Sequence, residues 1–295
     1  MTDLISTYKQ LLNLQDAKFE LVAHEDSIVA IVYKIVTSDG KELILKICDK
    51  PHHYEREVYF LKYFADKLPI AKIIQLIAPK PGVHAATLME CLPGDVLTKE
   101  HLNPALNFEI GALLAKIHST RTADFGDLID PSSNEDDPRK YFAAKFEESF
   151  AECEGHLPST ILQSCRTFYE RNKDKLLTVD GPCIIHRDYR PGNILAHNGH
   201  VSGIIDWASA RAGFAEDDLC LLEVGEWGSD KGLKEAFLAG YASVRKVPIF
   251  SDVMPLLLLN RAIAVIGYTV KIGTWDNRDA AFYARNMKIL EMALH

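Results

Sequence analysis

Three polar residues in the second half of the chain have the types and the spacing that phosphoryl transfer requires. Residues 184–195 read IIHRDYRPGNIL and residues 203–207 read GIIDW, which places Asp188 shortly before Asn193 and Asp206 at the end of an apolar run. An amide oxygen and a carboxylate oxygen suit Mg²⁺, whose other ligands are usually water and substrate phosphates. The remaining carboxylate, Asp188, could accept the proton of an incoming hydroxyl. The pattern favours this chemistry over ordinary polar residues around a turn.

The residues between Asn193 and Asp206 predict a hairpin that brings the two together. Asn198-Gly199 between two apolar runs is a strong signal for a two-residue type I′ turn. Side chains alternate along a strand, so Asp206 would share a face with Asn193 at a diagonal distance of about 7 to 8 Å. The predicted facing pairs are His197 with His200, Leu195 with Ser202, and Asn193 with Ile204.

An upstream lysine and glutamate extend the pattern. Residues 28–37 and 43–47 are rich in β-branched and aliphatic residues and predict two strands, with Lys46 inside the second. Residues 52–68 predict a helix that carries Glu57 on its apolar face. Because an unpaired buried charge is costly, Lys46 and Glu57 are expected to pair. The alternative is a surface glutamate and a lysine that extends to solvent.

With these residues the chain resembles the aminoglycoside phosphotransferase and choline kinase group of small-molecule kinases. The resemblance covers most of the chain, and the loop 186–193 and Asp206-Trp207 are its most specific parts. Further matches are Lys46, Glu57, the linker-like segment 88–94, the helical segment 111–118, Gly213 and Asp218. The resemblance implies an α+β, bilobal protein-kinase-like fold. A small antiparallel-sheet lobe with a helix would occupy residues 1–92, with a hinge near 89–93, and a larger, mostly helical lobe would occupy 93–295.

The resemblance also implies a role for each site residue. ATP, or GTP as an alternative, would lie between the lobes, with Lys46 on its phosphates and Glu57 holding Lys46. Asp188 would be the catalytic base, and Asn193 and Asp206 would bind Mg²⁺. Further candidates are Ser27, Glu90 and Cys91 at the nucleotide, and His186, Arg190 and Asp218 in support of the loop. Asp218 is expected to cap a helix, and Arg190 either touches the transferred phosphate or braces the loop.

Two features depart from the group. Residues 23–28 read AHEDSI, where the group usually has a small or glycine-containing turn over the phosphates. Phosphate binding there would rest on backbone amides and Ser27, with the neighbouring acids pointing outward. Arg187 and Arg190 stand where the group often has glycine and histidine.

Asp124-Phe125-Gly126 spells the metal-binding triplet of protein kinases, but it precedes the loop 186–193, whereas the metal aspartate of kinases follows it. We therefore expect residues 124–126 to form a loop, followed by a polar connection over 130–138. The short segment after Asp206 and the absence of A-P-E disfavour a protein kinase. A catalytically retired nucleotide-binding protein is the non-enzyme alternative.

Composition agrees with a cytoplasmic enzyme and decides little else. A chain of 295 residues with 47% hydrophobic content can bury a large core. Six cysteines without a C-x-x-C pair indicate free thiols in a reducing compartment. Residues 4–12 predict an amphipathic helix on the small lobe rather than a signal peptide. The apolar tract 254–272 contains Asn260 and Arg261 and predicts a core helix rather than a membrane span. A net charge of −8 without a basic run argues against nucleic acid, and a monomer or homodimer is expected.

The acceptor is the least determined part. Acidic and aromatic residues after the metal site suggest a cationic hydroxylated molecule bound by charge pairing and cation–π contact. The candidates are Glu223, Glu226, Trp227 and Asp230, with solvated helix starts as the alternative interpretation. By resemblance an aminoglycoside-like acceptor leads, but kinases of choline or ethanolamine, fructosamine, homoserine and methylthioribose share the same core.

Overall fold

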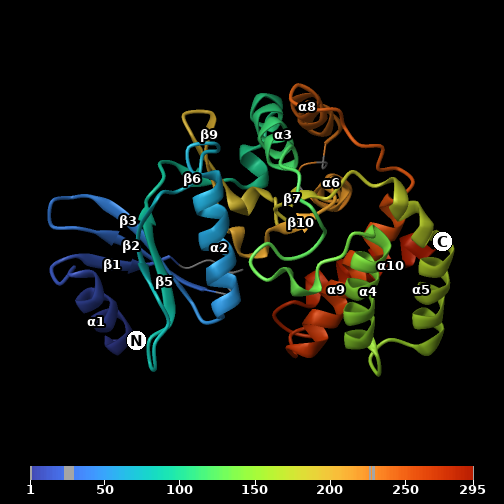
Figure 1. Ribbon diagram of the computed structural model, residues 1–295, viewed down its shortest axis with the longest axis horizontal. Helices are drawn as coiled ribbons and strands as arrows, with labels where there is room; N and C mark the ends of the chain where they lie inside the picture. Colours follow the sequence, from blue (N-terminus) through green and yellow to red (C-terminus); the bar gives the residue numbers. More distant parts are fainter. Residues whose placement is uncertain (1, 23–29, 226, 228–229, 295) are drawn as a thin grey trace.

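The computed structural model describes residues 2–22, 30–225, 227 and 230–294, and it has two lobes (Figure 1). The small lobe is built around a five-stranded antiparallel sheet in the order β1-β2-β3-β5-β4. Its elements are α1 (Thr2–Leu12), β1 (Lys18–Leu21), β2 (Ala30–Val36), β3 (Glu42–Cys48), α2 (Pro51–Phe64), β4 (Ile73–Ile77) and β5 (Ala85–Glu90). The last strand ends two residues before the predicted lobe boundary at 92, which itself stays a prediction.

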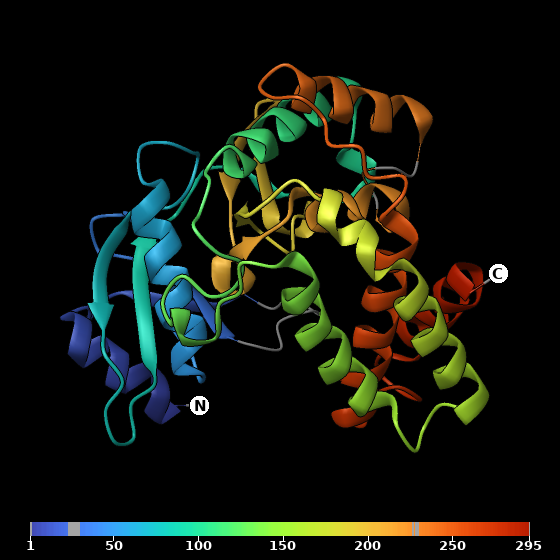
Figure 2. The ribbon, with the colours of Figure 1, turned by 45° about the vertical axis from the view of Figure 1, so that its right-hand side comes forward.

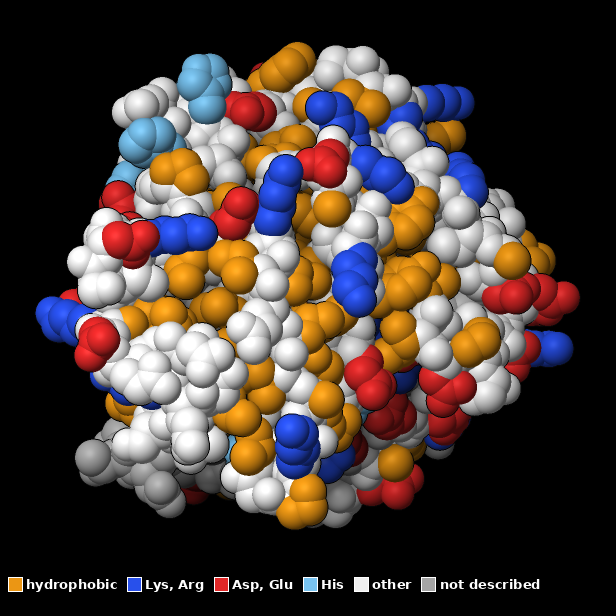
Figure 3. Space-filling model, turned by 60° about the vertical axis from the view of Figure 1, so that its left-hand side comes forward, with side chains coloured by type: hydrophobic (Ala, Val, Ile, Leu, Met, Phe, Trp, Pro, Cys, Tyr) orange, Lys and Arg blue, Asp and Glu red, His pale blue; other side chains and the backbone are white. Residues whose placement is uncertain are grey.

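The sheet of the small lobe is covered on one side by α1 and on the other by α2 (Figure 1). Tyr8 and Leu12 of α1 are buried against Ile35 and Leu45 of the sheet, as the amphipathic pattern predicts. Helix α2 ends at Phe64 rather than at residue 68, because the following backbone leaves the helical region and turns at a left-handed residue, Asp66. Figure 3 shows the side of the molecule that carries this lobe, where acidic and basic side chains are interspersed among apolar ones.

The large lobe is mostly helical. Its strands are β6 (Asp95–Val96), β7 (Cys183–Ile185), β8 (Ile194–His197), β9 (His200–Ile204) and β10 (Arg211–Gly213). Its helices are α3 (Pro104–His118), α4 (Pro138–Cys153), α5 (Ser159–Asn172), α6 (Ala215–Leu219), α7 (Leu221–Val224), α8 (Lys231–Ala242), α9 (Met254–Lys271) and α10 (Ala280–Leu294). Short 3₁₀ turns are η1 (Lys99–His101), η2 (Pro131–Ser133), η3 (Lys173–Thr178), η4 (Pro191–Asn193) and η5 (Trp207–Ser209). The mixed α+β architecture agrees with the sequence prediction.

Two apolar cores fix the large lobe. One continues into the small lobe, where Phe60 of α2 stacks on Trp207 and Phe64 packs against it at a tilt. The other lies among α4, α5, α9 and α10. Figure 2 shows these four helices packed together in one part of the large lobe. Among the described helices, α9 is the one long and apolar enough to cross a membrane. Half of this helix is buried inside the protein.

The hairpin of β8 and β9 carries the expected turn but a different register. Asn198 and Gly199 both have positive φ, 51° and 82°, and His197 faces His200. A bulge then shifts the pairing, so that Leu195 faces Gly203 and Ile194 faces Ile204. The predicted pairs Leu195 with Ser202 and Asn193 with Ile204 are therefore wrong. Asn193 lies in η4, immediately before the strand.

The remaining local predictions agree with the structure. Residues 124–126 form a loop in which Phe125 bridges to Glu135 and Gly126 to Ala212. Asp137 caps α4 at the end of the predicted polar connection. All six cysteines are free, and all except Cys91 are buried.

Candidate active site

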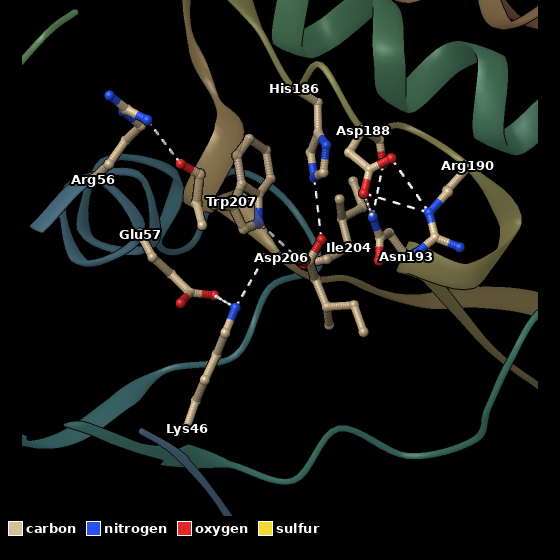
Figure 4. Close-up of polar contacts among 12 residues, drawn as sticks. Lys46, Arg56, Glu57, His186, Asp188, Arg190, Asn193, Ile204, Asp206 and Trp207 are labelled. Carbon is tan, nitrogen blue, oxygen red and sulfur yellow. Dashed lines mark hydrogen bonds and ion pairs between the residues drawn. The ribbon is translucent and has the colours of Figure 1, made fainter. Parts of the chain in front are cut away.

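Lys46 is the centre of an ion-pair triad between the lobes (Figure 4). Its ammonium lies 2.8 Å from Oε1 of Glu57 and 2.9 Å from Oδ1 of Asp206. Strand β3 supplies the lysine, α2 supplies the glutamate, and Asp206 follows β9. Burial alone would lower the pKa of Lys46, but the two carboxylates raise it above its ordinary value. Lys46 is therefore protonated, and the predicted pairing with Glu57 is present.

Asp206 is held in an uncommon backbone conformation. Its φ of 62° and ψ of 66° lie in the left-handed region, which costs a non-glycine residue about 1 kcal/mol or more. The next residue, Trp207, is buried and donates its indole N–H to the Ile204 carbonyl at 3.1 Å. Burial acts to raise the pKa of Asp206, yet the charge of Lys46 lowers it overall, so the carboxylate is ionised. The buried, hydrogen-bonded Trp207 thus holds the adjacent backbone and fixes the direction of the Asp206 carboxylate.

Asp188 and Asn193 contact one another directly (Figure 4). The Asn193 amide donates to Oδ2 of Asp188 at 2.7 Å and to its backbone carbonyl at 2.8 Å. Arg190 Nε lies 3.3 Å from Oδ1 of Asp188, a contact that fits the loop-bracing alternative for this arginine. Because Nδ2 of Asn193 is engaged with Asp188, its Oδ1 is the atom left to coordinate a cation.

Asp218 holds the loop 186–193 through its backbone and does not cap a helix. It is a residue of α6, whose N-cap is Phe214, so the capping prediction is wrong. Its two carboxylate oxygens accept the backbone N–H groups of His186 at 2.8 Å and Arg187 at 2.6 Å. His118 also lies 3.1 Å from Oδ2. The buried carboxylate orders the loop because it satisfies two consecutive backbone donors.

His186 ties the loop to the strand that leads to Asp206. Its Nε2 lies 3.1 Å from the Ile205 carbonyl, which can only accept, so Nε2 carries the proton. Burial lowers the pKa of His186, which keeps the imidazole neutral. This contact is compatible with the supporting role that the sequence suggests for His186, which stays a prediction.

The donor set fits a magnesium ion bound together with a nucleotide. Asn193 and Asp206 offer an amide and a carboxylate oxygen, both hard ligands. Within residues 2–22, 30–225, 227 and 230–294, no three histidine, cysteine, aspartate or glutamate side chains gather into a metal cluster. Mg²⁺ does not need such a cluster, because one or two protein ligands plus substrate phosphates suffice.

The predicted nucleotide contacts at the lobe connection are only partly described. Glu90 ends β5, and its Oε2 accepts the backbone N–H of Lys72 at 3.3 Å. Cys91 follows and is half-buried. Ser27 lies outside the described residues.

Those predicted acceptor residues that the structure describes are engaged in contacts within the protein. Trp227 is 1% exposed and donates its indole N–H to the Tyr189 carbonyl at 2.6 Å, so it cannot stack on a substrate. Asp230 caps α8 by accepting the N–H groups of Gly232 and Leu233. Glu223 pairs with Lys234 at 2.5 Å, and Glu226 lies outside the described residues. Their proposed substrate role is wrong for Trp227, and the contacts of Asp230 and Glu223 are structural.

A pocket of about 460 Å³ instead opens beside Asp188. It is walled by the loop that carries Arg187 and by helices α4, α6, α9 and α10. Its charged and polar lining residues are Lys145, Arg187, Asp188, Ser209, Asp217, Asn260 and Arg261. The sequence held one signal for it, since Asn260 and Arg261 interrupt an otherwise apolar tract.

The comparison with protein families decides the assignment. The family model described as the phosphotransferase enzyme family matches residues 25–248. The chain belongs to this family.

Relatives of this phosphotransferase are small-molecule kinases. Homoserine kinase of Neisseria meningitidis serogroup B is 29% identical over 229 residues, which are 72% of this chain and 70% of the relative. Aminoglycoside phosphotransferase APH(4)-Ia has a TM-score of 0.71 at 14% identity, with 99% of both chains covered. Amicoumacin kinase hAmiN, solved with AMP-PNP, Ca²⁺ and Ami, has a TM-score of 0.66 at 16% identity. The match covers 93% of this chain and 88% of the kinase chain. These similarities support a kinase with a hydroxyl acceptor and a protein-kinase-like fold.

Sequence reasoning missed several residues that hold the phosphotransferase together. Arg56 of α2 donates to the Ala208 carbonyl at 3.0 Å and pairs with Asp127, which ties the small lobe to η5. Tyr189 donates its hydroxyl to the Ile110 carbonyl at 2.9 Å. These contacts join segments that are far apart in the chain, so no local sequence pattern predicts them.

Proposed function

We propose that this phosphotransferase moves the γ-phosphoryl group of ATP to a hydroxyl of a small molecule bound in the pocket beside Asp188. The observation that carries the proposal is the position of Asp188. Its carboxylate lines the pocket and also accepts the amide of Asn193, next to the triad of Lys46, Glu57 and Asp206. One carboxylate therefore stands between a space for an acceptor and the groups suited to a nucleotide.

The chain's own residues account for the reaction by position and charge. Lys46, held by Glu57, binds phosphate oxygens, while Asn193 and Arg190 orient Asp188. The acceptor oxygen forms a bond to the γ-phosphorus, the bond from that phosphorus to the bridging oxygen breaks, and ADP leaves. Asp188 takes the hydroxyl proton. Mg²⁺, held by Asn193 and Asp206, would neutralise charge on the phosphates.

The pocket favours a small metabolite over a polycationic drug as the acceptor. Structures of the family include enzymes bound to hygromycin B and gentamicin, and the curated relative is a homoserine kinase. Lys145, Arg187 and Arg261 line the pocket of this chain. Because like charges repel at short range, a polyamine such as an aminoglycoside is disfavoured there. We therefore rank homoserine-like acceptors above the aminoglycosides that the sequence had placed first.

The test is a coupled assay of ATP consumption with a panel of acceptors. The panel contains L-homoserine, choline, ethanolamine, methylthioribose, a fructosamine, hygromycin B and gentamicin, each with ATP and with GTP. We expect acceptor-dependent consumption with at least one compound, and a rate lower by about a hundredfold or more with the Asp188→Asn variant. Consumption equal to that variant for every compound would favour the catalytically retired alternative.

The free cysteines support a cytoplasmic location, where ATP is available.

A further inference from the structure

The pocket beside Asp188 carries a positive charge that the rest of the chain does not predict. Its lining includes three cationic residues, Lys145, Arg187 and Arg261, and two anionic residues, Asp188 and Asp217. The net charge of the lining is therefore +1. The whole chain has a net charge of −8. Helices α4 and α9, which bring Lys145 and Arg261 to the pocket, lie side by side in both ribbon views (Figures 1 and 2). The fold thus gathers cations where the acceptor must bind.

Two of these cations have a partner, and one has none among the described residues. Lys145 lies 3.2 Å from Glu148, and Arg187 lies 3.9 Å from Asp217. Arg261 makes no hydrogen bond or ion pair with any residue in the part of the chain that the structure describes. Arginine offers a fixed fork of donors that matches a carboxylate or a phosphate. A half-buried guanidinium that forms no ion pair with any described residue is suited to a ligand anion.

The pocket also contains groups that require donors. Oδ1 of Asn260 is buried and has no hydrogen-bond partner among the described residues. Such an atom costs free energy unless a ligand donor reaches it. Asp217 lines the same pocket, and Arg187 and Arg261 both act to lower the pKa of its carboxyl, while burial raises it overall. A ligand ammonium near Asp217 and Asn260 would satisfy both groups.

We propose that the acceptor of this enzyme is a hydroxylated amino acid, whose carboxylate binds Arg261 with Lys145 and Arg187, and whose ammonium binds Asp217 and Asn260. The proposal rests on the proposed function, because it places the acceptor hydroxyl at Asp188. The three polar ends of the ligand then meet three separate groups of the pocket. Arg261 is the specificity-determining residue, since it is the one of the three cations that forms no ion pair with a described residue.

The experiment compares pairs of compounds that differ only in the carboxylate. L-homoserine is paired with L-homoserinol and L-serine with serinol, in which a hydroxymethyl group replaces the carboxylate. Hygromycin B represents polycations, and phosphoethanolamine represents phosphate-bearing ligands without a carboxylate. Steady-state kinetics and thermal-shift titrations are run on the parent chain, on Arg261→Gln, and on Arg285→Gln. Arg285 is an exposed residue of α10 outside the pocket and serves as the matched control.

We expect an amino acid to be preferred over its alcohol by about tenfold or more in kcat/KM, as one charge-assisted contact supplies. Arg261→Gln should raise the KM of the acid by a similar factor and leave the KM for ATP and the alcohol unchanged. Arg285→Gln should match the parent. Preference for the alcohols or for hygromycin B, or an equal effect of Arg261→Gln on acid and alcohol, would overturn the proposal. Tighter binding of phosphoethanolamine than of any carboxylic acid would also overturn it.

The thermal-shift arm separates this proposal from the proposed function. If amino acids stabilise the parent but not Arg261→Gln while no ATP is consumed, the binding site stands and the kinase assignment fails. If ATP is consumed but no carboxylic acid stabilises the parent more than Arg261→Gln, the acceptor class assigned here is wrong.

Discussion

Lys46 and Asp206 lie 160 positions apart in the sequence, and their side chains form a 2.9 Å ion pair that joins the two lobes. The lysine side chain is 12% exposed, and its other partner, Glu57, is 4% exposed. A charge buried to this degree is stable only with its partners. The stability of the small lobe therefore depends on the same residue that we propose to bind the phosphates of the nucleotide.

The first prediction separates these two roles. Lys46→Met leaves Glu57 buried without its cation, so the free energy of unfolding should fall by about 3 kcal/mol in urea denaturation. The double variant Lys46→Met with Glu57→Leu should recover most of this loss, because the buried carboxylate is removed and Asp206, whose side chain is 43% exposed, is the only triad charge left. Neither variant should consume ATP. Recovery of turnover in the double variant would contradict the role of Lys46 at the phosphates.

The second prediction concerns Asp218, which accepts the backbone N–H groups of His186 and Arg187. Asp218→Asn retains one accepting oxygen and should displace the loop. Because small displacements of a catalytic group cost up to about a hundredfold, kcat should fall at least tenfold while the KM for ATP stays unchanged. Tyr241→Phe is the milder control, since it removes only the hydroxyl that lies 2.9 Å from His118 Nδ1. An equal loss of nucleotide affinity in Asp218→Asn would point to general unfolding instead.

The sequence was sufficient where chemistry is local. The loop around Asp188, the strand of Lys46 and the inward face of α2 each follow from spacing within about ten residues, and the structure agrees with them. The register of β8 and β9 was not predictable, because the bulge depends on contacts outside the hairpin, such as the bond of Ser202 Oγ to the Pro93 carbonyl at 2.5 Å. The role of Asp218 and the burial of Trp227 likewise depend on partners more than thirty residues away.

The acceptor pocket illustrates the same limit. Lys145 comes from α4 and Arg261 from α9, and only the packing of these helices brings them to one pocket. Glu223 and Asp230 are close to Asp206 in the chain but do not line this pocket. Proximity in sequence was a poor guide to proximity in space, and the charge of the proposed acceptor changed accordingly.

The third prediction is a dependence of stability on pH. Glu216 is 1% exposed, accepts the Asp180 N–H on both oxygens at 2.9 and 3.1 Å, and burial raises its pKa to about 7. The folded state therefore retains a proton that the unfolded state releases near pH 4.5. This contribution is fully present below that pH and is lost as the pH rises through about 7, with a maximum of about 3 kcal/mol.

Glu216→Gln provides the check, because glutamine keeps an acceptor for the Asp180 N–H and does not titrate. Urea unfolding between pH 5 and 8 should show a smaller decline in stability for Glu216→Gln than for the parent. Identical slopes for the two proteins would show that Glu216 does not carry the effect.

The fourth prediction tests the corrected role of Trp227. Trp227→Phe removes the indole donor and leaves the Tyr189 carbonyl without that partner, which should lower the free energy of unfolding by about 1 to 3 kcal/mol. The KM for the acceptor should not change, because the side chain is inside the core. A change in KM without a loss of stability would restore the substrate role that the sequence had suggested.

The most direct measurement is the rate of phosphoryl transfer by Asp188→Asn, taken together with its affinity for ATP and Mg²⁺. The substitution preserves the shape of the side chain and removes its ability to take a proton. We predict a loss of turnover of about a hundredfold to ten-thousandfold, the range typical of a general base, with a dissociation constant for the nucleotide that stays near that of the parent. Transfer at the parental rate would contradict the account at its centre.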